Sequence, residues 1–107
     1  MTLSEQTLTR IQSLAYLYKT GYHSETVDST IAKLVTMEHS RLEQESATLA
    51  ERLQFFEQQY NLPSADFYQK FQNGELGDDA DLFEWSAFYQ MWLSIQARLQ
   101  TLQSKPE

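Results

Sequence analysis

The residues of this chain whose side chains could take part in chemistry or binding are concentrated in one short run, residues 73–85, which reads NGELGDDADLFEW. The run holds five carboxylates, no base and two of the chain's three glycines, and it closes on a tryptophan. Carboxylates beside flexible glycines can bind a metal ion, exchange protons with a substrate or contact a basic surface. The candidate site residues are Gly74, Glu75, Gly77, Asp78, Asp79, Asp81, Glu84 and Trp85.

The start of a helix is the simplest interpretation of this run. Asp78, Asp79 and Asp81 lie at or just inside the start of a predicted helix, where the first N–H groups are unpaired and the helix dipole is positive. One Asp is expected to cap this helix, and the others stabilise it through the dipole. Glu75 and the total of five acids stay unexplained, so a surface that binds Lys or Arg of another protein remains a second interpretation.

A metal site or a catalytic site fits the run less well. The calcium-loop pattern D-x-[DN]-x-[DN]-G is not met, because Gly77 precedes the acids. His23 and His39 are the only histidines. They would lie roughly 24 Å apart along a helix, too far to share a metal ion. Because no nucleophile–base set can be nominated either, we expect no metal, no cofactor and no enzymatic activity.

The charge balance limits the partners. Fifteen acids against eight bases give a net charge of −7. Nucleic acids and anionic membranes are bound through Lys and Arg, so both are disfavoured, and a basic protein partner suits the chain better. No apolar stretch approaches the ~18 residues that cross a bilayer. The first residues, MTLSEQTLTR, lack a signal-peptide pattern, and cysteine is absent. We therefore expect a cytoplasmic protein.

Long helices must position these residues. A length of 107 residues suits one domain, and only 3 Gly and 2 Pro favour helices over a sandwich or barrel. Ser4, Ser24 and Ser64 are the expected N-caps of the first three helices, and Gly21 and Gly74 are expected to end the first and the third. The apolar spacing predicts helices over residues 4–19, 25–60, 65–72 and 79–103.

The second and the last of these helices carry heptad seams, which predict a coiled-coil-like pairing. An antiparallel pair buries both seams, so the predicted fold is all-α, a long helical hairpin with a short N-terminal helix and a short connecting helix. His39 and Ser46 interrupt the first seam, and His39 is expected to set the register rather than to bind a ligand. Where the helices meet near the turn, the predicted contacts join Phe55, Phe56 and Tyr60 to Trp85 and Phe88.

The two paired helices differ in predicted length, about 54 Å against about 38 Å. The beginning of the longer helix, residues 25–34, is therefore left without a partner, although it carries Val27, Ile31 and Leu34. The first helix can fold back over it, or a second copy of the chain can cover it. We expect both, and hence a homodimer, because a thin core buries little area against its ordering entropy.

Residues 67–92, FYQKFQNGELGDDADLFEWSAFYQMW, also carry a resemblance. From Phe67 to about Leu102 the chain resembles small helical proteins of cyanobacteria and archaea that are classed as antitoxins of two-gene toxin–antitoxin modules. The resemblance implies a non-enzymatic protein that covers the active surface of a basic toxin, such as a ribonuclease, with the run 73–85 as its contact surface. A structural or assembly adaptor that forms a helical homo-oligomer is the alternative.

Overall fold

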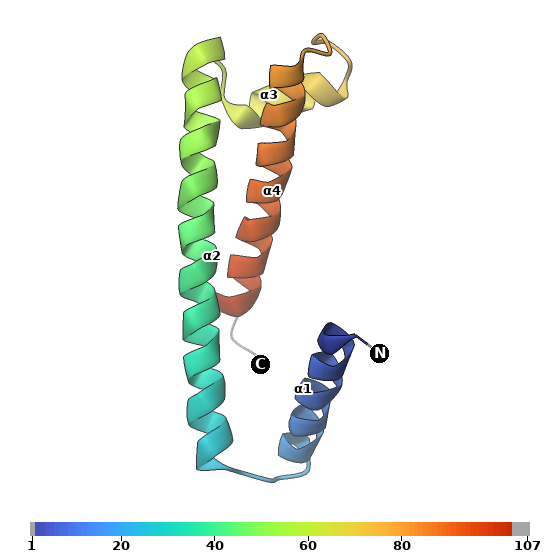
Figure 1. Ribbon diagram of the computed structural model, residues 1–107, viewed down its shortest axis with the longest axis vertical. Coiled ribbons are helices and arrows are strands. Elements are labelled where there is room, and N and C mark those ends of the chain that lie inside the picture. Colours follow the sequence, from blue (N-terminus) through green and yellow to red (C-terminus); the bar gives the residue numbers. More distant parts are fainter. Residues whose placement is uncertain (1, 104–107) are drawn as a thin grey trace. The chain divides into compact units, whose positions relative to one another are not determined.

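The computed structural model describes residues 2–103, and within this range it contains four α-helices and no strand (Figure 1). The all-α prediction is confirmed, and each predicted helix end lies within one residue of the observed one. No helix in residues 2–103 combines the length and the apolar character that a membrane span requires. The helices are α1 (Leu3–Lys19), α2 (Glu25–Tyr60), α3 (Ser64–Gln72) and α4 (Ala80–Gln103).

The chain divides into two compact units, Met1–Val35 (unit 1) and Thr36–Glu107 (unit 2). The boundary falls inside α2, so this helix gives its first turns to unit 1 and the rest to unit 2. The single domain expected from the length stays a prediction.

In unit 1, α1 begins with a capping box rather than with the predicted Ser4 cap. The Thr2 hydroxyl accepts a hydrogen bond from the Glu5 N–H at 3.1 Å, and the Glu5 carboxylate accepts one from the Thr2 N–H at 3.0 Å. The prediction for Ser4 was wrong because this reciprocal pair satisfies the first turn two residues earlier. Gly21 ends the helix as predicted, with φ at 97°.

The turn between α1 and α2 is held by polar contacts. The Tyr18 hydroxyl lies 2.9 Å from the Ser24 carbonyl oxygen and 2.7 Å from an Asp28 carboxylate oxygen. Ser24 caps α2 as predicted, because its hydroxyl accepts a hydrogen bond from the Val27 N–H at 3.3 Å. His23 lies on the exposed side of this turn, 2.7 Å from Asp28.

Unit 1 does not bury the apolar start of α2. Ile31 is 41% exposed and Leu34 is 49% exposed, while Val27 is half-buried. The first helix was expected to share this cover with a second copy of the chain, so the exposure that remains within this unit does not contradict that expectation, and the second copy stays a prediction. In unit 1, hydrogen bonds join the Tyr18 hydroxyl of α1 to Ser24 and to Asp28 in the first turn of α2.

In unit 2, α2 and α4 pair in antiparallel register (Figure 1). Gln103 lies 2.9 Å from His39, and seven residues along, Gln96 donates to the Ser46 hydroxyl at 2.6 Å. A step of seven along α2 thus matches a step of seven back along α4, which is the antiparallel heptad pairing that was predicted. The buried residues of this seam are Leu42, Leu49, Leu53, Phe56, Leu82, Trp85, Ile95 and Leu99.

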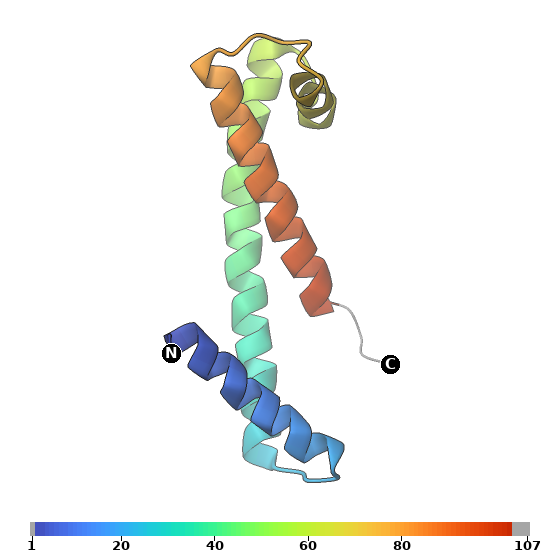
Figure 2. The ribbon, with the colours of Figure 1, turned by 90° about the vertical axis from the view of Figure 1, so that its right-hand side faces the viewer.

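The short helix α3 lies crosswise at the end of this pair and is seen end-on in Figure 2. Its N-cap residue is Pro63, which offers no side-chain cap. Instead, the Glu57 carboxylate of α2 accepts a hydrogen bond from the Ser64 N–H at 2.8 Å. The prediction that Ser64 caps α3 was wrong, because its hydroxyl lies inward and bonds to Trp85.

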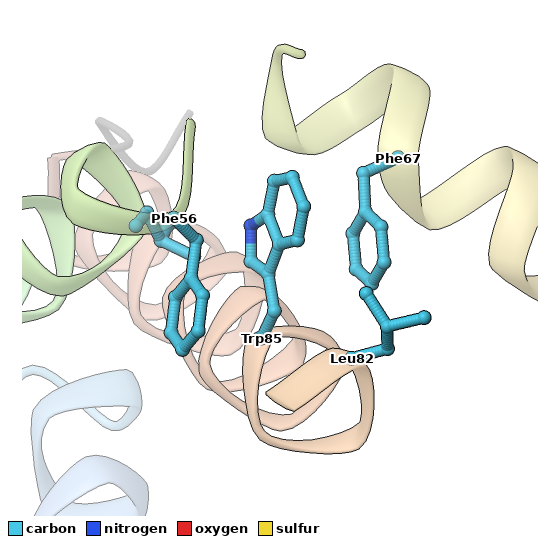
Figure 3. Close-up of a cluster of buried hydrophobic side chains, with 5 residues drawn as sticks. Phe56, Phe67, Leu82 and Trp85 are labelled. Atoms are coloured by element: carbon cyan, nitrogen blue, oxygen red, sulfur yellow. The ribbon is translucent and has the colours of Figure 1, made fainter. Parts of the chain in front are cut away.

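Trp85 is the centre of the core of unit 2 and has no exposed surface. Figure 3 shows its indole between the rings of Phe56 and Phe67, with centroid distances of 5.6 Å and 3.7 Å and nearly parallel planes. Tyr60 also stacks on it, at 5.5 Å. Phe55 does not join this core, contrary to prediction. It is 65% exposed, because its neighbour Phe56 occupies the seam position and the next residue of a helix points about 100° away.

Candidate functional site

The acidic loop, residues 73–84, connects α3 to the first turn of α4 and carries every predicted acidic site residue on the surface. None of its carboxylates forms an ion pair with a Lys or Arg within the described part of the chain. Side chains that lack an internal counter-ion keep their full charge available to a partner. The exposed carboxylates are those of Glu75, Asp78, Asp79, Asp81 and Glu84.

The backbone fixes where this loop begins. Gly74 adopts φ 73°, and its N–H bonds to the Phe71 carbonyl at 3.2 Å, while the Glu75 N–H bonds to the Lys70 carbonyl at 3.0 Å. These bonds satisfy the last carbonyls of α3 and confirm that Gly74 ends this helix. Leu76 is half-buried and packs against the Trp85 cluster. The loop is thus anchored at a glycine turn and at one apolar side chain.

The start of α4 differs from its prediction in one respect. Asp79 precedes the helix, and its backbone carbonyl accepts hydrogen bonds from the N–H groups of Leu82 and Phe83, at 3.0 and 3.2 Å. No carboxylate of Asp78, Asp79 or Asp81 accepts a hydrogen bond from a backbone N–H of α4 in the described range. The expected Asp cap is therefore not formed, although the acids still interact favourably with the helix dipole.

Tyr60 of α2 faces the acids of the first turn of α4. Its partial burial raises the pKa of the phenol, and the negative charges of Asp81 and Asp79 and a hydrogen bond to Asp81 raise it further. Tyr60 also stacks on Trp85, but it is 39% exposed and lies at the edge of the core rather than in it. Tyr60 thus contacts both the buried Trp85 and the acids at the start of α4.

The remaining predicted site residues divide into surface and support. Gly74 and Gly77 are exposed, and neither has a neighbouring atom where a side chain would be. Trp85 is fully enclosed, so it supports the acidic loop from below and offers no atom to a partner in this conformation. In the pattern FEW, Phe83 and Glu84 are therefore exposed, and Trp85 belongs to the core.

The acidic loop presents charge outward rather than toward a common centre. Within residues 2–103, no three His, Asp or Glu side chains converge closely enough to hold a metal ion. Outward-facing carboxylates create a negative potential that attracts a cationic surface and orients its approach.

Three of the chain's four arginines line one open groove between α2 and α4, a feature that the sequence analysis missed. The groove has a volume of about 740 Å³ and contains Arg41, Arg52 and Arg98 above an apolar floor that includes Leu49 and Ile95. Arg41 is paired with acids of its own helix, while Arg52 lies 5.0 Å above the Phe88 ring. Counting bases along the chain could not show this clustering, but their heptad positions could have.

The net charge is unequally divided between the two units. Residues 1–35 contain three acids and three bases, whereas residues 36–107 contain twelve acids and five bases. Unit 2 therefore carries the whole formal charge of −7, and unit 1 is neutral. Electrostatic attraction of a basic partner is thus a property of unit 2 alone.

Comparison of the chain with protein-family models, with curated proteins and with solved structures finds no match.

Proposed function

We propose that this protein is a non-enzymatic binding module whose acidic loop binds a basic protein, in the manner of an antitoxin that covers the active surface of its toxin. The observation that carries the proposal is the exposure of five carboxylates, none of which is paired with a Lys or Arg among residues 2–103. A ribonuclease-type toxin binds phosphates through Lys and Arg, and carboxylates can occupy the same cationic sites.

The packing below the loop supports this proposal. Trp85, Phe67 and Leu76 tie the loop to the core, so the acids are presented on a supported surface rather than on a free tail. A preorganised charged surface loses less entropy on binding than a disordered one. The resemblance of residues 67–102 to antitoxins points to the same class of partner.

The alternative is an assembly adaptor that works as a helical homo-oligomer. The observation that favours it is the exposed apolar surface of unit 1, where Leu8 and Ile11 are each 53% exposed. An adaptor would need no cationic partner at the acidic loop, so the two functions predict different effects of charge reversal there.

The test is co-purification of the chain with the product of the adjacent gene. We expect a complex that Asp78→Lys with Asp79→Lys abolishes and that weakens as salt rises. The matched control is Glu43→Lys with Glu51→Lys, which makes the same charge change on exposed residues of α2 and should retain binding. Equal loss of binding in both variants would show that net charge, and not the acidic loop, determines binding, which contradicts the proposal. A complex that survives in both variants would contradict it as well.

A further inference from the structure

Unit 1 has no interior of its own. Every residue from 2 to 35 is exposed or half-buried, and no side chain in this range is buried. A two-helix unit without a core is not stable by itself, because its apolar surface is not removed from water. The largest exposed aliphatic side chains are Leu3, Leu8, Ile11, Leu17, Ile31 and Leu34.

Four of these six side chains follow helical spacing, whereas Leu3 and Leu17 lie on another side of α1. Leu8, Ile11 and Ala15 recur at three and four residues and form a stripe along α1, and Ile31 and Leu34 continue an apolar stripe on the first turns of α2. Such stripes are the seams of helices that pack against further helices. The unit therefore presents half of a helical bundle.

We propose that a second copy of this chain covers this surface, forming a two-fold dimer in which the two α1 helices pack side by side and antiparallel. Unit 1 carries three acids and three bases, so two copies meet there without net repulsion, whereas the −7 of unit 2 opposes association through that unit. The proposal is independent of what the acidic loop binds.

The charge order along α1 selects the antiparallel arrangement. Glu5 lies in the first turn of this helix and Lys19 in the last. A two-fold axis near the middle of α1 places Glu5 of each copy beside Lys19 of the other, and it also opposes the two helix dipoles. A parallel pair would instead bring Glu5 next to Glu5 and Lys19 next to Lys19.

Light scattering of the full chain tests the surface. We expect the wild type to have twice the mass of the chain at micromolar concentration, and Leu8→Glu with Ile11→Glu to raise the dimer dissociation constant about a hundredfold or more. The matched control, Thr9→Glu with Ser13→Glu, adds the same charge to the opposite face of α1 and should remain dimeric. Trp85 and Trp92 both lie in unit 2, so their fluorescence shows whether that unit stays folded in each variant.

Disulfide trapping tests the orientation, because the chain contains no cysteine of its own. Ile11→Cys lies near the proposed axis and should form a covalent dimer on oxidation. Ser4→Cys should not, because an antiparallel pair holds the two Ser4 positions roughly 24 Å apart and a disulfide spans less than about 7 Å. A monomeric wild type, dissociation of the control variant, or cross-linking at Ser4 would each overturn the proposal.

Discussion

Trp85 donates its indole N–H to the Ser64 hydroxyl across 2.9 Å, and both residues are buried. The same Ser64 donates its backbone N–H to the Glu57 carboxylate at 2.8 Å. One residue of α3 is thus bonded to α2 through its backbone and to α4 through its side chain. This pair of bonds joins the three helices of unit 2 just below the acidic loop.

Ser64→Ala should lower the free energy of unfolding by about 1–3 kcal/mol, because it leaves the buried Trp85 N–H without an acceptor. Urea unfolding followed by tryptophan fluorescence measures this change. Ser94→Ala is the matched control, since Ser94 is an exposed residue of α4, and it should change stability by no more than about 0.5 kcal/mol. Equal stability of the two variants would show that the hydrogen bond contributes nothing to the fold.

Two neighbouring phenylalanines give a second prediction. Phe56→Ala should cost about 3–5 kcal/mol, because it opens a cavity beside Trp85 and removes a stacked ring. Phe55→Ala should cost less than about 1 kcal/mol, because the Phe55 side chain is 65% exposed. Denaturation midpoints of the two variants provide the comparison. A larger loss of stability at Phe55 than at Phe56 would show that Phe55, and not Phe56, occupies the buried seam position.

The seams and the helix ends of unit 2 could be predicted from the sequence because local patterns determine them. Leu42, Leu49 and Phe56 lie seven residues apart, and this spacing alone places them on one helix face. Gly74 likewise marked the end of α3, since a left-handed residue is needed there.

The errors lie where a residue's partner is distant in sequence. Ser64 looked like a cap by local rules, but its hydroxyl bonds to Trp85, twenty-one residues later. The cover of Ile31 and Leu34, which are exposed in the single chain, stays a prediction, because no spacing rule identifies what covers them. The composition of residues 73–85 marked the acidic loop, but its five acids and its tryptophan could not be divided into surface and core without coordinates.

Raising the pH should destabilise the protein through Tyr60. Its pKa is raised in the folded state, so the folded chain retains a proton that the unfolded chain loses as the pH passes the ordinary tyrosine value of about 10. The stability that protonated Tyr60 contributes is fully present below pH ~10 and is lost as the pH rises through the raised pKa of the folded state. Urea midpoints from circular dichroism on both sides of pH ~10 measure this loss.

Tyr60→Phe should reduce this alkaline loss of stability, because the variant has no phenol to ionise beside Asp81 and Asp79. Tyr16→Phe removes one hydroxyl from an exposed residue of unit 1 and serves as the matched control. The same slope of stability against pH in both variants would show that the contact between Tyr60 and the acidic loop has no energetic consequence.

The two glycines of the acidic loop should respond in opposite directions to the same substitution. Gly74→Ala should destabilise unit 2 by about 1 kcal/mol, because φ 73° forces a Cβ into the left-handed region. Gly77 has no such φ and open space around it, so Gly77→Ala should stabilise the fold by about 0.4–1 kcal/mol by restricting the unfolded chain. Unfolding free energies from urea titration distinguish the two. If Gly77→Ala also destabilises the fold, the loop needs a backbone conformation at Gly77 that alanine does not tolerate. The conformation of the acidic loop described above would then be wrong at that residue.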